Sequence, residues 1–564
     1  MELLKKAFSW KETDSSHRLM LLLVLVLGVL SFFWGEKVPA GGGLGWDGVI
    51  YADMVRNLGS MISGGQLSGY YTQRILPAAI VRGMLLLSGA PIDNGNIIRG
   101  FEVYNLILLA GACWAWKRIA GVFDLSLGGR WIGFSGIFVS YECSKQAFYY
   151  PVLTDVTALF VAMLLLLFYI EKKPLALFVT TVIGAFCWPV VSFCGAFLLL
   201  FLRTELPKDV VAPASSGRSR RIFRRVKRGG LVLLALSVIG YIIMALIGPL
   251  PDSPCNVPAF VAHAHQHFAS YCTQRRVLLG FERLLTALPS FAGMLLALAI
   301  LVGSGKFAPA VLTSLRRAKP ALVALAAAAV LVPFFLVKAA SNPAIANASS
   351  LKNLIKLALL PSEGKFLLPF VTLAVFWGPV LLLMILCWKA FCVEARKLGP
   401  GVMAIMGMCM FLGLVGEPRF LTIAWPFLVL ALVLAFEKMH VKASFKYAFS
   451  ILTVLFAQFW MKINLAPWSA SPFEGLQDYP KQIYLMHYGL WMSWWPYCIQ
   501  LVALVLSAMW LYRTMRKAGQ LNTSIKVHEV RVFTGSLCAN MSETSSPSTI
   551  TVVRGKKSHF DKSE

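Results

Sequence analysis

Long apolar runs separated by short polar segments occupy most of the 564-residue chain. A helix needs about 20 mostly apolar residues to cross a bilayer, and the runs have about this length. They are too long and too even to be strands of a membrane β-barrel, which alternate apolar and polar residues over about ten positions. The pattern therefore predicts an all-α polytopic membrane protein with about 14 transmembrane helices. The expected spans are residues 18–34, 99–117, 130–147, 152–170, 174–188, 189–202, 230–249, 289–303, 319–338, 367–388, 401–416, 420–436, 446–464 and 492–512.

Two apolar runs need a separate interpretation. Trp188-Pro189 interrupts residues 174–202, so this run is either one kinked span or two, which gives about 13 or about 14 helices in all. Residues 75–89 are apolar but short, and they contain Arg82. If they crossed the membrane, the basic segment 218–228 would lie outside. We therefore interpret 75–89 as an amphipathic helix at the membrane interface.

Composition and charge narrow the class of protein. The chain is 58% hydrophobic and 14% charged, which excludes a soluble enzyme and a disordered protein. Its 53 Lys and Arg residues against 26 Asp and Glu residues give a net charge of +27. Most of these cations fall in alternate connecting segments, so the positive-inside rule explains the excess better than nucleic-acid binding does. The same rule places both termini in the cytoplasm and makes membrane lipids a partner.

The predicted outer loop 250–288 contains cysteines and histidines. Cys255 and Cys272 form a disulfide there if the outside is oxidising, and two free thiols are the alternative. The sequence His-Ala-His-Gln-His at 263–267 has no acidic neighbour to complete a metal site, so we expect a solvated loop. The long outer loops are residues 35–98, 250–288, 339–366 and 465–491.

The first outer loop contains a predicted amphipathic helix over residues 47–62. Apolar residues recur there at helical spacing from Ile50 onward, and Asp47 stands at the start after a run of glycines. Asp47 is therefore either a helix cap or a carboxylate held at the outer membrane surface, where it faces a lipid-borne substrate.

Four motifs follow one another in a recognisable order. Residues 47–52 read Asp-Gly-Val-Ile-Tyr-Ala, and residues 70–77 read Tyr-Tyr-Thr-Gln-Arg-Ile-Leu-Pro. Residues 150–155 read Tyr-Pro-Val-Leu-Thr-Asp, and residues 416–420 read Gly-Glu-Pro-Arg-Phe. In order and sidedness they resemble the GT-C superfamily of polytopic glycosyltransferases, in particular its aminoarabinose and protein mannosyl transferase-like branch. Two departures are that Gly48 replaces a frequent second acidic residue and that Ile-Leu-Pro replaces a double proline.

This resemblance implies an enzyme, a membrane glycosyltransferase that uses a polyprenyl-phosphate-linked sugar donor. The sugar would pass, with inversion, to a hydroxyl of a glycan, lipid or protein acceptor. The site would lie on the outer face of a membrane, expected to be the bacterial cytoplasmic (inner) membrane. No cofactor is named, no metal ligand is assigned, and a divalent metal ion is left open.

The resemblance also implies roles for individual residues. Asp47 would be the general base that accepts the acceptor proton, and Arg74 and Arg419 would bind the donor phosphate. The alternatives are that Arg74 snorkels to water and that Arg419 pairs with Glu417 alone. Asp155 either reaches a polar cavity or caps its helix. Apart from the resemblance, the spacing of three residues near the outer end of one helix predicts that Glu142 and Lys145 form an ion pair rather than a site. The complete set expected to bind substrate or phosphate is Arg74, Arg419, Asp155, Tyr51 and Glu417.

The rival class is a lipid or sugar transporter or flippase without transferase activity. Such proteins usually contain internal repeats and paired broken spans, and no repeat is evident in this chain. The expected organisation is a cytoplasmic N-terminus (1–17), a GT-C-like catalytic transmembrane module (18–205), a basic cytoplasmic loop (206–228), a variable transmembrane module (229–512) and a polar, disordered cytoplasmic tail (513–564).

Overall fold

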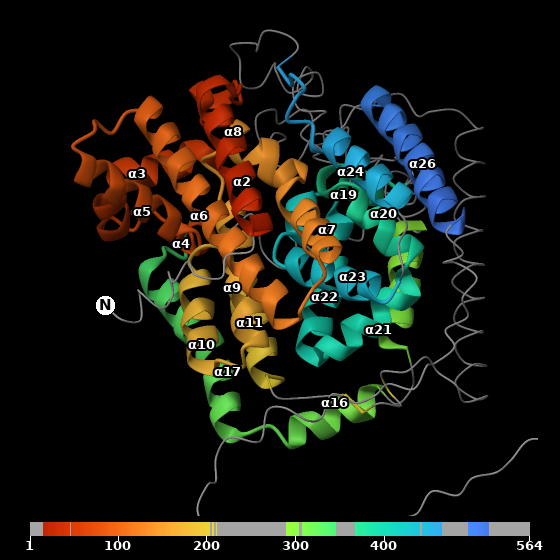
Figure 1. Cartoon of the computed structure of the whole chain (residues 1–564). Coiled ribbons are helices and arrows are strands. Elements are labelled where there is room, and N and C mark those ends of the chain that lie inside the picture. The colour runs from red at the N-terminus through yellow and green to blue at the C-terminus, as the bar shows by residue number, and fades with distance from the viewer. Residues whose placement is uncertain are drawn as a thin grey trace, which may run out of the picture. The chain divides into compact units, whose positions relative to one another are not determined.

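The computed structural model describes residues 15–45, 47–202, 206–207, 210, 289–303, 307–345, 367–439, 443–464 and 494–517. The chain divides into two units, Met1–Gln520 and Leu521–Glu564, and all described residues belong to the first. Every regular element among these residues is helical, and none is a strand (Figure 1). The all-α expectation is therefore confirmed for the described part of the chain.

Several helices are long and apolar enough to cross a membrane. They are α2 (Ser15–Trp34), α6 (Asn94–Val122), α17 (Pro320–Ala340) and the segment Pro496–Met515 of α26 (Trp494–Lys517). The number rises from 4 to 6 if each of two bent helix pairs is one span. These helices are compatible with a multi-pass membrane protein. Their outward surfaces are apolar: Phe33 on α2 is 67% exposed.

The other helices are shorter (Figure 1), and many of them are apolar in sequence. They are α3 (Asp47–Ser63), α4 (Gly69–Thr72), α5 (Ile75–Ser88), α7 (Leu127–Phe138), α8 (Ala147–Tyr149), α9 (Asp155–Ile170), α10 (Pro174–Gly184), α11 (Val191–Leu200), α16 (Phe307–Arg316), α19 (Leu368–Trp377), α20 (Pro379–Leu386), α21 (Trp388–Leu398), α22 (Pro400–Leu412), α23 (Trp425–Glu437) and α24 (Ala443–Ala457), with short turns η2 (Ala40–Gly43), η3 (Glu142–Gln146), η5 (Gly413–Val415) and η6 (Pro418–Leu421).

The expected span 367–388 is broken in the structure. Helices α19 and α20 meet at an angle of 117°. Gly378 lies between them with φ of +77°, a conformation that side chains disfavour, and Pro379 starts the second helix because it lacks an N–H to continue the first. An apolar run of this length is therefore a bent pair here, and not one straight helix.

The run 174–202 forms two helices, α10 and α11, which pack against each other (Figure 1). A turn at Ala185–Val190 that includes Trp188-Pro189 separates them. The proline has no amide hydrogen to donate, so the helix ends before it. The structure thereby decides between one kinked helix and two in favour of two.

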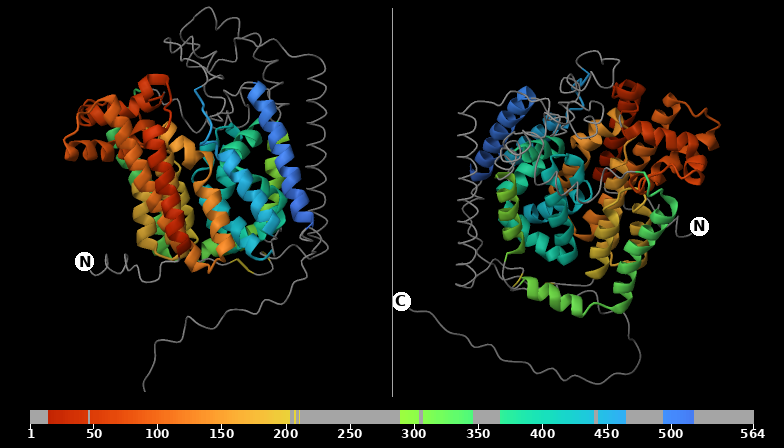
Figure 2. Two further views of the ribbon diagram at one scale, coloured as in Figure 1. Left: turned by 45° about the horizontal axis from the view of Figure 1, so that its top comes forward. Right: turned by 180° about the vertical axis from the view of Figure 1, so that it is seen from behind.

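The connecting segments gather at the two ends of the helices. At one end, Leu76 N donates to Phe186 O at 3.1 Å, and Asn342 N donates to Leu67 O at 2.8 Å. At the other end, Tyr169 Oη donates to Leu398 O at 2.8 Å. Helices α3 and α5, red and orange in Figure 2, lie together beside the first end. Each of these contacts joins described segments that the charge pattern assigns to the same side of the membrane.

Candidate functional site

Asp47 and Arg419, which are far apart in sequence, lie close to each other. They are at the same end of the helices as the contacts Leu76–Phe186 and Leu67–Asn342. Arg419 Nη1 lies 3.6 Å from Asp47 Oδ2, and the Arg419 guanidinium donates to both oxygens of Glu417 at 3.2 and 3.3 Å. Asp47 is 33% exposed, whereas Arg419 and Glu417 are 17% and 18% exposed. Arg419 is therefore shared by two carboxylates, one of which is accessible from outside the protein.

The start of α3 fixes the position of Asp47. Gly48 N donates to the Tyr150 hydroxyl at 3.2 Å, which ties the first turn of α3 to the segment before α9. Gly45 has φ of +74°, and a Cβ at this position would clash with the Tyr150 ring. The glycine before Asp47 thus allows the close approach that places this helix start.

Arg419 is placed by the aromatic core below it. Trp377 Nε1 donates to Pro418 O at 3.0 Å, and the Trp377 ring stacks on Trp425 with ring centroids 4.5 Å apart. Trp425 Nε1 in turn donates to Gly136 O at 2.8 Å. Both tryptophans are fully buried, so the short turn η6 rests on a rigid surface.

Arg74 is buried beside two aromatic rings. Its guanidinium carbon lies 3.9 Å from the Tyr70 ring centroid and 4.9 Å from that of Trp188, which belongs to the α10–α11 turn. Arg74 is only 5% exposed, and its Nε has no hydrogen-bond partner among the described residues. The snorkelling alternative is therefore wrong, because the charge is held inside the protein.

Asp155 is the first residue of α9 and is 3% exposed. Neither of its carboxylate oxygens accepts a hydrogen bond from a described residue, so it does not cap its helix in that way. Asn105 holds the preceding segment in place, because its amide donates to Ala147 O and to Pro151 O, both at 2.9 Å. Asp155 interacts electrostatically with Arg419 and Arg74.

Glu142 was not among the predicted site residues, and its position differs from the expected ion pair. Lys145 Nζ binds Glu36 Oε1 at 2.8 Å instead, which corrects the pairing expected from the spacing of three residues. The reason is that residues 142–146 form a π-helical turn, in which the spacing of side chains differs from that of an α-helix. Glu142 is completely buried and interacts electrostatically with Asp155 and Arg419.

These residues form one group, which we call the polar cluster. The tyrosines of α3 and α4 cover one side of it: Tyr51 interacts with Arg74 and with Asp47, and its ring packs edge-on against Tyr71. Burial raises the pKa of both phenols above the ordinary value, so they remain neutral hydroxyl groups at physiological pH. The polar cluster consists of Asp47, Arg74, Glu142, Asp155, Glu417 and Arg419.

The structure thus brings together Asp47, Arg74, Asp155, Glu417 and Arg419, with Tyr51 beside them. Their roles remain predictions, because proximity alone assigns no chemistry. Glu142 is the residue that sequence reasoning missed. Its signal was present as a carboxylate inside an apolar segment, where charges are costly and usually have a function.

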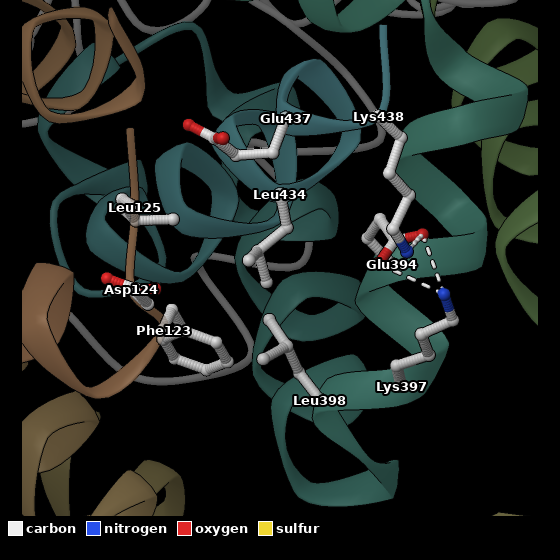
Figure 3. A pocket seen from close by; sticks show the side chains of 9 residues that line it. All are labelled: Phe123, Asp124, Leu125, Glu394, Lys397, Leu398, Leu434, Glu437 and Lys438. Atoms are coloured by element: carbon white, nitrogen blue, oxygen red, sulfur yellow. Dashed lines mark hydrogen bonds and ion pairs between the residues drawn. The ribbon is translucent and has the colours of Figure 1, made fainter. Parts of the chain in front are cut away.

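A cavity of about 320 Å³ lies at the other end of the helices (Figure 3). Three of its charged side chains bind each other, because Glu394 binds Lys397 at 3.0 Å and Lys438 at 2.6 Å. It contains none of the predicted site residues. The lining residues are Phe123, Asp124, Leu125, Glu394, Lys397, Leu398, Leu434, Glu437 and Lys438.

Among the described residues, no group of three or more His, Cys, Asp and Glu side chains is arranged to hold a metal ion. Cys255 and Cys272, with the expected disulfide, and the histidines of the same loop lie outside the described residues. Comparisons of this chain with protein-family models, with curated proteins and with solved structures find no match.

Proposed function

We propose that this protein is a membrane glycosyltransferase that moves a sugar from a polyprenyl-phosphate-linked donor to an acceptor hydroxyl. The observation that carries the proposal is the convergence of Asp47, Arg419, Arg74 and Asp155 from four separate segments. It combines an accessible carboxylate with two guanidinium groups, which are the groups needed for proton transfer and phosphate binding. Under this proposal the fold is GT-C-like, with about 14 spans.

Arg419 can link donor binding to activation of the base. Its guanidinium contacts Glu417 and Asp47 in the structure. A donor phosphate that forms a bidentate pair with Arg419 would compete for these contacts and free the Asp47 carboxylate for the acceptor hydroxyl. Arg74, which lies close to the Tyr70 and Trp188 rings, would stabilise the negative charge that develops on the leaving phosphate.

The reaction would be a single displacement. The acceptor oxygen forms a bond to the anomeric carbon while the bond to the phosphate oxygen breaks, and the acceptor proton passes to Asp47. The products are an inverted glycoside and a polyprenyl phosphate. Because Asp47 is one-third exposed and the arginines are more buried, the acceptor would approach from the exposed side.

The location is part of the proposal. The polar cluster lies at the end of the helices that the positive-inside rule assigns to the outside. The site would therefore face the outer side of the membrane, expected to be a bacterial inner membrane. This side suits an enzyme that adds sugars to cell-envelope glycans, lipids or exported proteins.

The test is turnover of a lipid-linked sugar by the purified protein in vesicles. We expect radiolabelled sugar to leave short-chain polyprenyl phosphate and appear on an acceptor, with polyprenyl phosphate released in equal amount. A flippase would instead move the intact donor between leaflets without consuming it. Movement without consumption, for each of glucosyl, mannosyl and arabinosyl donors, would exclude the transferase proposal.

A further inference from the structure

Glu142 and Asp155 are two buried carboxylates to which no described residue donates a hydrogen bond. Both side chains are at least nine-tenths buried, and all four carboxylate oxygens lack a hydrogen-bond partner among the described residues. Leaving a buried polar group unpaired costs about 1–3 kcal/mol, and more for a charged group. Such a cost indicates that the partner arrives with a ligand.

The fold also directs the cation on the same turn, Lys145, away from Glu142. Lys145, three residues further along η3, reaches Glu36 and Met461 O. The turn is π-helical, and such turns occur frequently at functional sites. Glu142 is thereby left facing Asp155 and Arg419 rather than a neighbour on its own turn.

Charge divides the polar cluster into two parts. A phosphate is attracted to Arg74 and Arg419 and repelled by carboxylates. The unpaired oxygens of Glu142 and Asp155 need a ligand that donates hydrogen bonds, and neutral hydroxyl groups meet this need without competing with the phosphate for the arginines. A sugar linked to a lipid phosphate carries a phosphate and hydroxyl groups in one molecule, so it has a group for each part of the polar cluster.

We infer that Glu142 and Asp155 form a subsite that binds the hydroxyl groups of the transferred sugar, while Arg74 and Arg419 hold its phosphate. The inference rests on the proposed function. It adds Glu142 as a substrate-binding residue and makes a polyhydroxylated sugar ring, with hydroxyls free to donate, the recognised part of the donor. A deoxygenated sugar would leave carboxylate oxygens unpaired and would bind weakly.

The test measures binding, without catalysis, and compares a lipid phosphate that carries a sugar with the same lipid phosphate without the sugar. Thermal stabilisation of the full chain in detergent is measured with short-chain polyprenyl phosphate and with the same lipid carrying glucosyl, mannosyl or arabinosyl groups. Wild-type protein should bind at least one sugar-bearing lipid about 10- to 100-fold more tightly than the bare phosphate, as expected for hydrogen bonds to charged groups. Glu142→Gln should lose most of this difference and keep its affinity for bare polyprenyl phosphate.

Two further variants keep the test decisive. Asp155→Asn should behave like Glu142→Gln, and it replaces that variant if Glu142→Gln does not fold. Glu394→Gln alters another buried carboxylate, at the other end of the helices, and should bind both lipids as wild type does.

The outcomes are distinguishable. If wild type prefers the sugar-bearing lipid and both Glu142→Gln and Asp155→Asn keep that preference, the subsite is wrong while the proposed function stands. If wild type binds neither lipid, the proposed function fails and the subsite fails with it.

Discussion

Arg419 connects the groups of the polar cluster that are accessible with those that are buried. It contacts Glu417 and Asp47 directly, and it interacts electrostatically with Asp155 and Glu142 inside the protein. Substitution of Arg419 would therefore change the charge balance of the whole polar cluster. For this reason the sharper test of chemistry lies at Asp47, whose removal leaves the buried groups in place.

Asp47→Asn should abolish sugar transfer without unfolding the protein. Asn retains the shape of the side chain but cannot accept the acceptor proton, and loss of a general base typically costs about 10²–10⁴-fold in rate. The measurement is the initial rate of lipid-linked sugar consumption in vesicles, together with the melting temperature in detergent.

Asp53→Asn is the matched control on the same helix. Asp53 binds Arg56 Nη1 at 2.7 Å and is not part of the polar cluster. Exposed ion pairs of this kind contribute little, so transfer should continue at close to the wild-type rate. Near-normal transfer by Asp47→Asn would show that another group accepts the proton.

Among the elements, α3 shows how much a sequence pattern can predict. The helical spacing of apolar residues predicted 47–62, and the structure contains α3 at Asp47–Ser63. Convergence of Asp47 with Arg419 could only be suggested by a family resemblance, because no local pattern connects residues so far apart. The Glu142–Lys145 pair failed because spacing rules assume an α-helix, whereas a π-turn redirects both side chains.

Gly45→Ala should displace Asp47, because Gly45 lies just before the start of α3, the helix that begins with Asp47. A Cβ at Gly45 would clash with the Tyr150 ring, and φ of +74° is unfavourable for alanine. We expect a destabilisation of about 1–3 kcal/mol and reduced transfer, because Gly48 would lose its contact with Tyr150. A melting curve and the vesicle assay measure the two effects.

Gly59→Ala gives the comparison at a glycine inside α3, the helix that Gly45 precedes. Nothing lies within 4 Å of a Cβ built at Gly59, and alanine favours the helix by about 0.5–1 kcal/mol. Equal melting temperatures for Gly45→Ala and wild type would mean that Tyr150 does not require the close approach.

On the scale of the whole molecule, the contacts between connecting segments divide the helix ends into two groups. This division agrees with the alternation of charge along the sequence, and it makes a topology experiment specific. Single cysteines at Gln66 and within 203–228 should label from opposite sides of the membrane with an impermeant maleimide, in a background without other reactive thiols. We expect Gln66→Cys to react from outside in intact cells and 203–228 to react only after the membrane is opened.

Labelling of 203–228 from outside would overturn this topology. It would also mean that residues 75–89, seen as α5, cross the membrane, since that single change reverses the sidedness of everything downstream. Lys173→Cys, in the α9–α10 connection, should react from the same side as 203–228.

Glu36 connects the segment that follows α2 with residues 145, 463 and 464, which lie far from it in the sequence. It accepts hydrogen bonds from Lys145 Nζ at 2.8 Å, from Ile463 N and from Asn464 N at 3.1 Å. Burial raises the pKa of this carboxyl, but the hydrogen bonds from Lys145, Ile463 and Asn464 outweigh burial and hold it below the ordinary value. A carboxyl with a lowered pKa stabilises the fold above its unfolded-state pKa of about 4.3, and this stabilisation is lost as the pH falls through the folded-state value.

Glu36→Gln should therefore lower the melting temperature at neutral pH, and the difference from wild type should shrink as the pH falls below about 4. Melting curves in detergent across this range measure the effect. Asp53→Asn, which removes an exposed ion pair, should show a much smaller difference at neutral pH. A gap between wild type and Glu36→Gln that does not change with pH would contradict the ionic character of this contact.

The bond between Glu36 and Ile463 spans 427 positions of the chain. At a translation rate of about 5–20 residues per second, Glu36 is synthesised roughly 20 to 90 s before Ile463. Asp47 waits for Arg419 over a similar interval. A growing chain therefore carries the Glu36 and Asp47 carboxylates well before the Ile463 amide and the Arg419 guanidinium that contact them in the folded protein, and the polar cluster cannot assemble until Arg419 has been synthesised.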